Sequence, residues 1–224
     1  MSGTAGVAFV DLAGFTALTE AHGDEEAADL VELFVSMARD ECADGDRVVK
    51  SIGDAVLLVS PSGAAAADLA ERVMRRCADE PGFPLVRGGV HSGPIVERTG
   101  DVFGTTVNVA ARIASQAYGG QLLVSHEVRT HLVDEVGEVI DLGEFEFRNL
   151  TEPVHLYEIP LGLDTGHAGI DPVCRMRVER EHAGGRLRYQ GTDYWLCSLA
   201  CAARFAANPA AFVDPPAVTE SEAQ

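Results

Sequence analysis

Lysine is almost absent from this chain of 224 residues, which holds a single one, Lys50, among 17 basic and 35 acidic side chains. The net charge of -18, most of it in the first 160 residues, repels nucleic acid and anionic lipid, so we expect neither as a partner. Long apolar runs are also missing, since the stretch from Val7 to Val10 is far shorter than the roughly 20 residues that cross a bilayer. Because the N-terminus also lacks a basic secretion signal, we expect a folded cytoplasmic protein with no membrane segment.

Cysteine is scarce as well, with five in the chain, and three of these are Cys174, Cys197 and Cys201. In a reducing compartment we expect thiols or metal ligands rather than disulfides. Composition changes along the chain, because residues 161–169 are rich in glycine and polar side chains and the only tryptophan follows them. The predicted organisation is a first domain (1–160), a linker (161–169), a cysteine-containing domain (170–213) and a disordered tail (214–224).

The first 160 residues alternate strand-like and helix-like patterns. Two β-branched runs, 47–52 and 55–60, flank Gly53-Asp54 and predict a hairpin with Asp54 at its tip. Further strands are expected at 7–12, 85–90, 95–97, 122–125, 144–147 and 154–159, and helices at 17–42, 64–79 and 107–117. This mixture predicts an α+β fold, a ferredoxin-like split βαβ arrangement in which a mixed sheet carries helices on one face.

Two carboxylates and one polar helix face are the first candidates for chemistry. Asp11 ends a predicted strand and Asp54 is in the hairpin turn, so adjacent strands would let both bind a hard cation such as Mg²⁺. A helix that begins near Gly14 would add free backbone N–H groups for a phosphate. Asn108 and Arg112 are four residues apart and share one helix face. Taken singly, each aspartate is more often a turn residue or helix cap, and the helix face a solvated one.

Six segments then carry a resemblance that covers nearly all of residues 5–160. They are FVDLAGFT (9–16), VKSIGDAVLL (49–58), RGGVHSGPIV (87–96), GDVFGTTVNVAARI (100–113), GGQLLVS (119–125) and FRNLTEPVHLYEI (147–159). In content and order they resemble the class III nucleotidyl cyclase catalytic domain. Several long motifs at family spacing are a much stronger signal than one short pattern.

The resemblance implies a metal and phosphate site. Asp11 and Asp54 match the family's metal-binding aspartates, with the backbone carbonyl of Leu12 as a further ligand for two Mg²⁺ or Mn²⁺ ions. The triphosphate loop corresponds to Gly14, Phe15 and Thr16.

Other positions imply substrate recognition. Asn108 and Arg112 match the pair that positions the ribose and stabilises charge on the α-phosphate, and Arg148 is where the family often has a lysine for the triphosphate. Lys50 and Asp101 match the pair that reads the base. Adenine presents an N6 donor and an N1 acceptor, which Asp101 and Lys50 complement, whereas guanine presents the reverse pattern. ATP is therefore the expected substrate, with cyclic AMP and pyrophosphate as products.

The family also implies a homodimer in which each active site takes residues from both subunits. A catalytically silent nucleotide-binding or scaffolding module is the alternative, and a guanylate cyclase is a narrower one that Lys50 and Asp101 disfavour. A diguanylate cyclase would show a Gly-Gly-Asp/Glu-Glu-Phe signature, which the sequence lacks.

Residues 170–213 resemble the YHS domain, through DPVCRM (171–176), YWLCS (194–198) and Cys201. Three thiolates, Cys174, Cys197 and Cys201, would suit Zn²⁺ or another soft metal such as Cu(I), and small buried cysteines are the alternative. The fourth ligand stays open between His182 and His167, and Arg175 replaces the family's usual glycine. A metal-sensing role that biases the cyclase dimer is a hypothesis.

Overall fold

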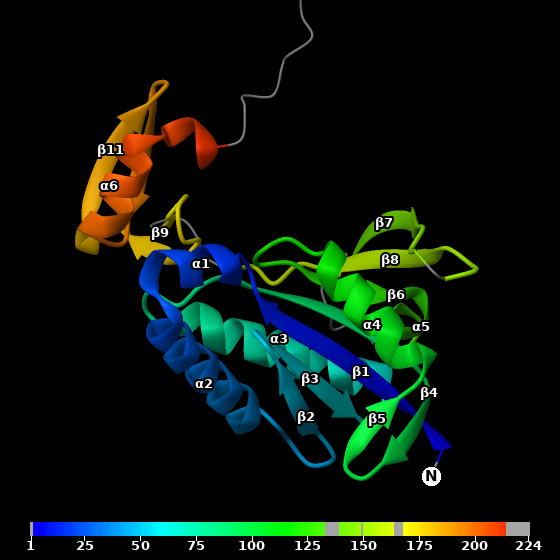
Figure 1. Ribbon diagram of the computed structural model, residues 1–224. Coiled ribbons are helices and arrows are strands. Elements are labelled where there is room, and N and C mark those ends of the chain that lie inside the picture. The colour runs from blue at the N-terminus through cyan, green and yellow to red at the C-terminus, as the bar shows by residue number, and fades with distance from the viewer. Residues whose placement is uncertain (1, 133–138, 149, 164–167, 214–224) are drawn as a thin grey trace, which may run out of the picture.

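The computed structural model describes residues 2–132, 139–148, 150–163 and 168–213 (Figure 1). Within these ranges one mixed sheet has the strand order β2-β3-β1-β4-β6-β8-β7, and β5 pairs with the end of β4. The strands are β1 (Ser2–Leu12), β2 (Arg47–Ile52), β3 (Ala55–Ser60), β4 (Val86–Arg98), β5 (Asp101–Phe103), β6 (Leu122–Ser125), β7 (Ile140–Phe145) and β8 (Val154–Ile159). The β4–β6 pair is parallel and the other pairs are antiparallel, so the predicted α+β fold with a mixed sheet is confirmed.

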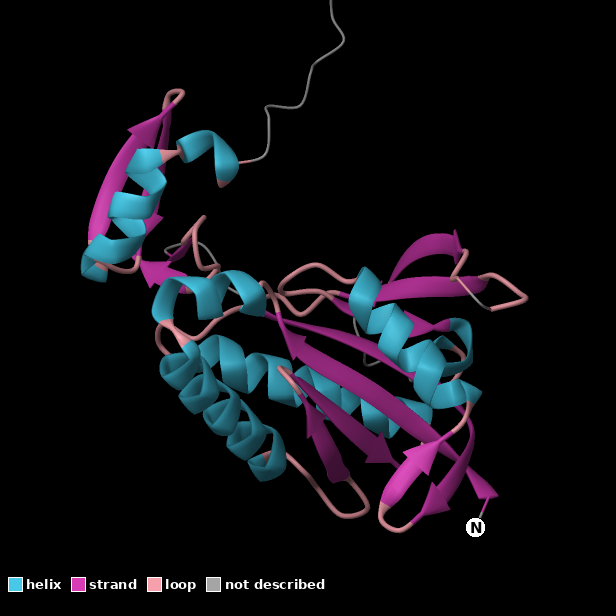
Figure 2. Ribbon diagram, viewed as in Figure 1, coloured by secondary structure: helices cyan, strands magenta, loops and turns pink. Residues whose placement is uncertain are grey.

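Helices cover both faces of this sheet, so the expectation of one covered face is wrong (Figures 1 and 2). On one face lie α2 (Asp24–Asp40), α3 (Gly63–Asp79) and the short α5 (His126–Arg129), and on the other lies α4 (Thr105–Gln116). Glycine at position 89 allows α4 to approach, because a Cβ there would lie 2.0 Å from the backbone nitrogen of Ala114. Periodicity locates a helix in the sequence but does not say which face of a sheet it covers.

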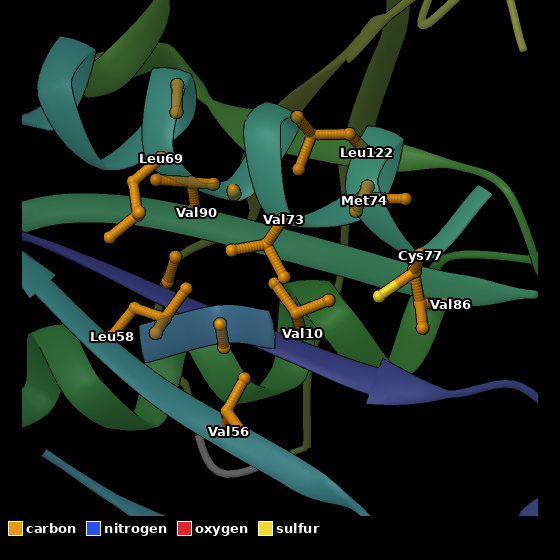
Figure 3. Packing of buried hydrophobic residues seen from close by; sticks show 14 of the residues in the cluster. Val10, Val56, Leu58, Leu69, Val73, Met74, Cys77, Val86, Val90 and Leu122 are labelled. Carbon is orange, nitrogen blue, oxygen red and sulfur yellow. The ribbon is translucent and has the colours of Figure 1, made fainter. Parts of the chain in front are cut away.

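The larger core lies between the sheet and α3. Figure 3 shows Leu69 and Val73 of α3 packed against Val10, Leu58 and other strand side chains, all of them fully buried. Successive strand residues point to opposite faces. Phe9, next to Val10, therefore packs in the second core beneath α4. By the same alternation Asp11 faces the α4 side of the sheet.

The hairpin prediction is confirmed, since β2 and β3 have the expected bounds and Gly53 has a φ of 61° in the turn. The predicted helix 17–42 is instead two helices, α1 (Phe15–His22) and α2, because Gly23 adopts a φ of 92° that no helix contains. The predicted strands 85–90 and 95–97 are one continuous strand, β4. Pairing along the whole length of β1 keeps β4 extended through Pro94.

The C-terminal unit is small. It contains β9 (Ala168–Ile170) paired with β10 (Arg177–Glu179), β11 (Gly185–Tyr189) paired with β12 (Thr192–Leu196), α6 (Leu199–Ala207) and two short 3₁₀ turns, η1 (Arg180–His182) and η2 (Pro209–Ala211). It lies against α1, and Pro84 forms an isolated bridge with Met176 (Figure 1). Part of the expected linker (164–167) and the whole expected tail (214–224) are outside the described residues. None of the helices in the described ranges is both long and apolar enough to cross a membrane.

Candidate active site

Two acidic side chains meet at one corner of the sheet. Asp11 pairs with Ala55, the residue after Asp54, and the N–H of Leu12 donates to the backbone carbonyl of Asp54 at 3.2 Å. Burial, and secondarily the negative charge of Asp54, raise the pKa of the Asp11 carboxyl. A hard divalent cation prefers such a set of oxygen donors, and its charge would relieve the repulsion between the carboxylates.

Arg87, which sequence reasoning missed, contacts the first of these carboxylates. It pairs with Asp11 across β1 and β4, and its Nε donates to Asp11 Oδ1 at 2.5 Å. Its Nη1 donates to the carbonyl of Ala117 at 3.2 Å, just beyond the end of α4. The guanidinium therefore ties α4 to the acidic corner. It lowers the pKa of Asp11, which opposes but does not cancel the rise caused by burial.

The turn after Asp11 leads directly into α1. Gly14 is the residue before the helix and has a left-handed backbone, with φ of 81° and ψ of 25°. Gly14 and Thr16 are exposed and Phe15 is half-buried. The first turn of any helix leaves backbone N–H groups without helical partners, so this one offers donors beside the two carboxylates.

Lys50 and Asp101, which are 51 residues apart in the sequence, form a close ion pair between β2 and β5. Lys50 Nζ donates to Asp101 Oδ2 at 2.6 Å, and Asp101 Oδ1 accepts from the N–H of Val102 at 2.8 Å. The hydrogen bond from Lys50 is the main reason that the pKa of Asp101 is lowered. Phe103, 49% exposed, lies beside the pair with its ring centroid 5.9 Å from Lys50 Nζ. One donor, one acceptor and an aromatic face thus adjoin one another.

In the described part of the chain the remaining predicted residues make no hydrogen bond to the acidic corner. Asn108 is exposed and Arg112 half-buried on α4, and the hydrogen bonds of the described residues include none from either side chain to Asp11 or Asp54. Arg148 is exposed in the turn that follows β7. Strand directions put that turn at the other end of the sheet from Asp11. One chain therefore brings together the acidic corner and, separately, the Lys50 pair.

A second cluster joins the C-terminal unit to α1. Cys197 Sγ lies 3.5 Å from Cys174 Sγ, 3.7 Å from Cys201 Sγ and 3.5 Å from His22 Nε2. A hydrogen bond with Cys174 lowers the pKa of Cys197 to about 6, whereas burial raises the pKa of Cys201 to about 12. His22 was missed, because it is 175 residues from Cys197. Of the two histidines expected, His182 is exposed and contacts Glu179, and 167 is outside the described residues.

Comparison with known proteins agrees with this arrangement. Residues 1–159 match the Adenylate and Guanylate cyclase catalytic domain family, and residues 169–215 match the YHS domain family. The chain is 42% identical over 128 residues to the pH-sensitive adenylate cyclase of Mycobacterium tuberculosis and 39% identical over 128 residues to an adenylate cyclase of Streptomyces coelicolor. These alignments cover 57% of this chain but 32% and 34% of those proteins, so the chain spans about a third of the length of these curated relatives.

Solved structures show the same likeness. Adenylate cyclases of Trypanosoma brucei, determined in their monomeric state, superpose with a TM-score of 0.62 at 26% identity. The match covers 70% of this chain and 87% of the Trypanosoma chain.

Proposed function

Because this chain belongs to the family of adenylate and guanylate cyclase catalytic domains and continues into a YHS domain, we propose that it converts ATP into 3′,5′-cyclic AMP and pyrophosphate. The observation that carries the choice of substrate is the contact between Lys50 and Asp101. Adenine would insert its N6 amino group against the Asp101 carboxylate and its N1 against the Lys50 ammonium. Guanine would set O6 and N1–H against groups of the same kind, which costs binding energy because buried polar groups stay unpaired.

The acidic corner fits a pair of divalent cations. Asp11 and Asp54 offer only oxygen donors, and the pKa of Asp11 is raised mainly by burial and secondarily by the charge of Asp54, both of which a bound cation would offset. We infer that these carboxylates, with the carbonyl of Leu12, hold two Mg²⁺ or Mn²⁺ ions. When bound, such ions activate the ribose 3′-hydroxyl and neutralise the departing pyrophosphate.

The chain's own residues would then bind and orient the nucleotide. Backbone N–H groups of Gly14, Phe15 and Thr16 donate to the triphosphate, to which Arg148 adds a positive charge. Asn108 orients the ribose so that its 3′-oxygen can attack the α-phosphorus while pyrophosphate leaves on the opposite side. Arg112 donates to the α-phosphate oxygens, where charge develops mainly in the transition state.

A second copy of the chain would complete each site. Within the described residues neither Asn108 nor Arg112 makes a hydrogen bond to Asp11 or Asp54, and Asn108 is exposed on α4. This supports a homodimer in which one subunit supplies the carboxylates and the other supplies α4. Ile52 and Phe103, 50% and 49% exposed, are the kind of apolar side chains that an interface would cover beside the Lys50 pair.

The test is incubation of the purified full chain with ATP or GTP, each with Mg²⁺ or Mn²⁺, followed by chromatographic assay for cyclic nucleotide and pyrophosphate. Cyclic AMP from ATP, absent with an Asp54→Ala variant that folds normally, is the expected result. A preference for GTP would establish the guanylate cyclase alternative. No cyclic product with any of the four combinations would leave the silent nucleotide-binding module as the better explanation.

A further inference from the structure

The cluster between α1 and the YHS domain is built as a metal site to which both domains contribute. We propose that His22, Cys174, Cys197 and Cys201 bind one Zn²⁺ ion, and that this ion fixes α1 and the phosphate-binding turn at its N-terminus. The proposal extends the three-cysteine site expected from the sequence, because the fourth ligand comes from the cyclase domain. The metal site does not depend on the proposed function, whereas its effect on ATP does.

The spacing of the four ligand atoms suits tetrahedral zinc. With Zn–S near 2.3 Å and Zn–N near 2.0 Å, ligand sulfurs should lie about 3.8 Å from one another and about 3.5 Å from the nitrogen. Cys197 Sγ is 3.5 Å from Cys174 Sγ and 3.7 Å from Cys201 Sγ. His22 Nε2 is 3.5 Å from Cys197 Sγ and 4.0 Å from Cys201 Sγ. All four atoms lie within 4.8 Å of one another. An ion could therefore enter with shifts of about an ångström or less.

His22 is held in the tautomer that a metal needs. Its Nδ1 lies 3.1 Å from Glu26 Oε2, one turn further along the chain, so that nitrogen donates its proton to the carboxylate. The lone pair is then on Nε2, the atom that faces the sulfurs. A carboxylate behind a histidine is the usual second partner of zinc-binding imidazoles, and it strengthens the ligand. A histidine that merely filled a core would need neither partner.

Asp171 organises the cysteine segments from within. Its buried carboxylate accepts from the N–H of Val173 and from the N–H of Cys197, each at 2.7 Å, and so joins the two turns that carry the thiols. The N–H of Cys201 donates to Ser198 Oγ, which caps α6. These bonds aim three thiols from two segments at one point, whereas a mini-core of small buried cysteines would not require them to converge.

Both ends of α1 meet the YHS domain. His22 ends the helix at the cluster, and at the other end the side chain of Arg175 covers Gly14, since a Cβ on Gly14 would lie 2.6 Å from Arg175 Cγ. Arg175 directly follows the ligand Cys174 and has a φ of 65°, which is uncommon for a side chain of this size. An ion that fixes Cys174 and His22 therefore constrains the eight-residue helix from both sides.

Metal binding is tested on the full chain under reducing conditions, by removing metal and titrating Zn²⁺ against a chromophoric chelator. We expect one equivalent in the wild type, about 10- to 100-fold weaker binding in Glu26→Gln, and a larger loss in His22→Ala. The matched control, His182→Ala, removes an exposed histidine of the YHS domain and should bind as tightly as the wild type. Wild-type affinity in His22→Ala, or less than one equivalent in the wild type, would overturn the site.

Identity and folding need separate arms. Co²⁺ replacing Zn²⁺ should show thiolate charge-transfer bands and tetrahedral ligand-field bands, both diminished in Cys197→Ser/Cys201→Ser. If that double variant unfolds, His22→Ala carries the test, because His22 is in the cyclase domain. A higher affinity for Cu(I) than for Zn²⁺ in direct competition would overturn the choice of ion. If Cys174 and Cys197 form a disulfide that persists under the reducing conditions of the assay, the proposed site is wrong.

Coupling has its own readout that requires no cyclase activity. Amide hydrogen exchange in residues 14–22 should slow when Zn²⁺ is added to the wild type and should not respond in His22→Ala. Unchanged exchange in the wild type would refute the coupling even if the ion binds. Should the chain form cyclic AMP, metal removal should raise KM for ATP severalfold with a smaller change in kcat, because the triphosphate turn loosens while Asp11 stays in place. An unchanged KM would count against the coupling.

Discussion

An equal mixture of two inactive variants, Asp54→Ala and Asn108→Ala, should recover about one quarter of the wild-type cyclase activity. The reason is that within the described residues neither Asn108 nor Arg112 makes a hydrogen bond to Asp11 or Asp54, which favours sites that span two chains. Each parent homodimer carries a defect in both of its sites. Loss of a metal carboxylate or of a transition-state contact should lower kcat by about 100-fold or more, so the background from either parent is small.

The magnitude follows from symmetry. Random exchange of subunits makes half of the dimers mixed, and in a mixed dimer both defects fall in one site while the other site has an intact Asp54 and an intact Asn108. Half of the dimers with one working site in two gives about a quarter of the wild-type activity. Isolated heterodimers, purified through two different affinity tags, should therefore reach about half.

Two controls separate shared sites from other kinds of rescue. A mixture of Asp11→Ala with Asp54→Ala should stay inactive, because both residues belong to the same half of the site. A double variant, Asp54→Ala/Asn108→Ala on one chain, should inactivate both sites of any wild-type subunit with which it pairs. The assay is cyclic AMP formation after verified subunit exchange. Inactive heterodimers of Asp54→Ala with Asn108→Ala, or active ones of Asp11→Ala with Asp54→Ala, would refute the shared-site geometry.

Three further predictions concern single positions. Lys50→Arg should lower kcat/KM for ATP about 10- to 100-fold despite the retained charge, because a wide guanidinium does not fit a single acceptor; unchanged kinetics would contradict this. Arg87→Gln removes the cation that lowers the pKa of Asp11, and this pKa should therefore rise further. The acid limb of the pH–kcat/KM profile should then move to higher pH, whereas a shift to lower pH would contradict the assigned sign. Gly89→Ala should lower the free energy of unfolding, measured with urea, by about 1–3 kcal/mol or more, because the added Cβ would meet the backbone of α4. Gly3→Ala, which has open space around it, should lower that free energy far less. Equal losses in the two variants would argue against this packing.

Elements with strong local signals could be predicted closely from the sequence. The hairpin of β2 and β3, the strand β6 and the strand β8 have the bounds that their apolar patterns predict. The β2 and β3 strands are rich in β-branched residues, and β6 and β8 are short segments rich in apolar residues, so a local pattern was enough to locate each of them. The mixed α+β sheet follows from the order of such elements along the chain.

Features that depend on tertiary contacts could not be predicted. The break between α1 and α2 is at Gly23, and a sequence does not reveal which glycines will adopt a positive φ. The position of α4 opposite α3 depends on Gly89, whose missing side chain admits the helix. The short strand β5 exists because it pairs with the end of β4, although three residues carry no strand pattern of their own.

The candidate site divides in the same way. Asp11, Asp54, Lys50 and Asp101 could be named because they lie in recognisable motifs. Two contacting residues were missed because their partners are distant in the sequence. Arg87, although it begins the motif RGGVHSGPIV, is 76 residues from Asp11, and His22 is 175 residues from Cys197. Strand register brings the first pair together and docking of the YHS domain brings the second. Neither register nor docking is written in a local pattern.

The acidic corner is linked through these two missed residues to both neighbouring parts of the molecule. Arg87 joins Asp11 to the carbonyl of Ala117, just beyond α4, the helix that would serve the other subunit's site. His22 joins α1 to the YHS domain. A divalent cation at Asp11 would share this carboxylate with the Arg87 guanidinium, so cation binding is expected to weaken the tie between Asp11 and α4. An ion at the cysteines acts on the opposite side, through the turn at Gly14 that follows Asp11 by three residues. The two events are therefore expected to act on one strand end, which gives a physical route by which a metal bound to the YHS domain could alter how tightly the corner holds ATP.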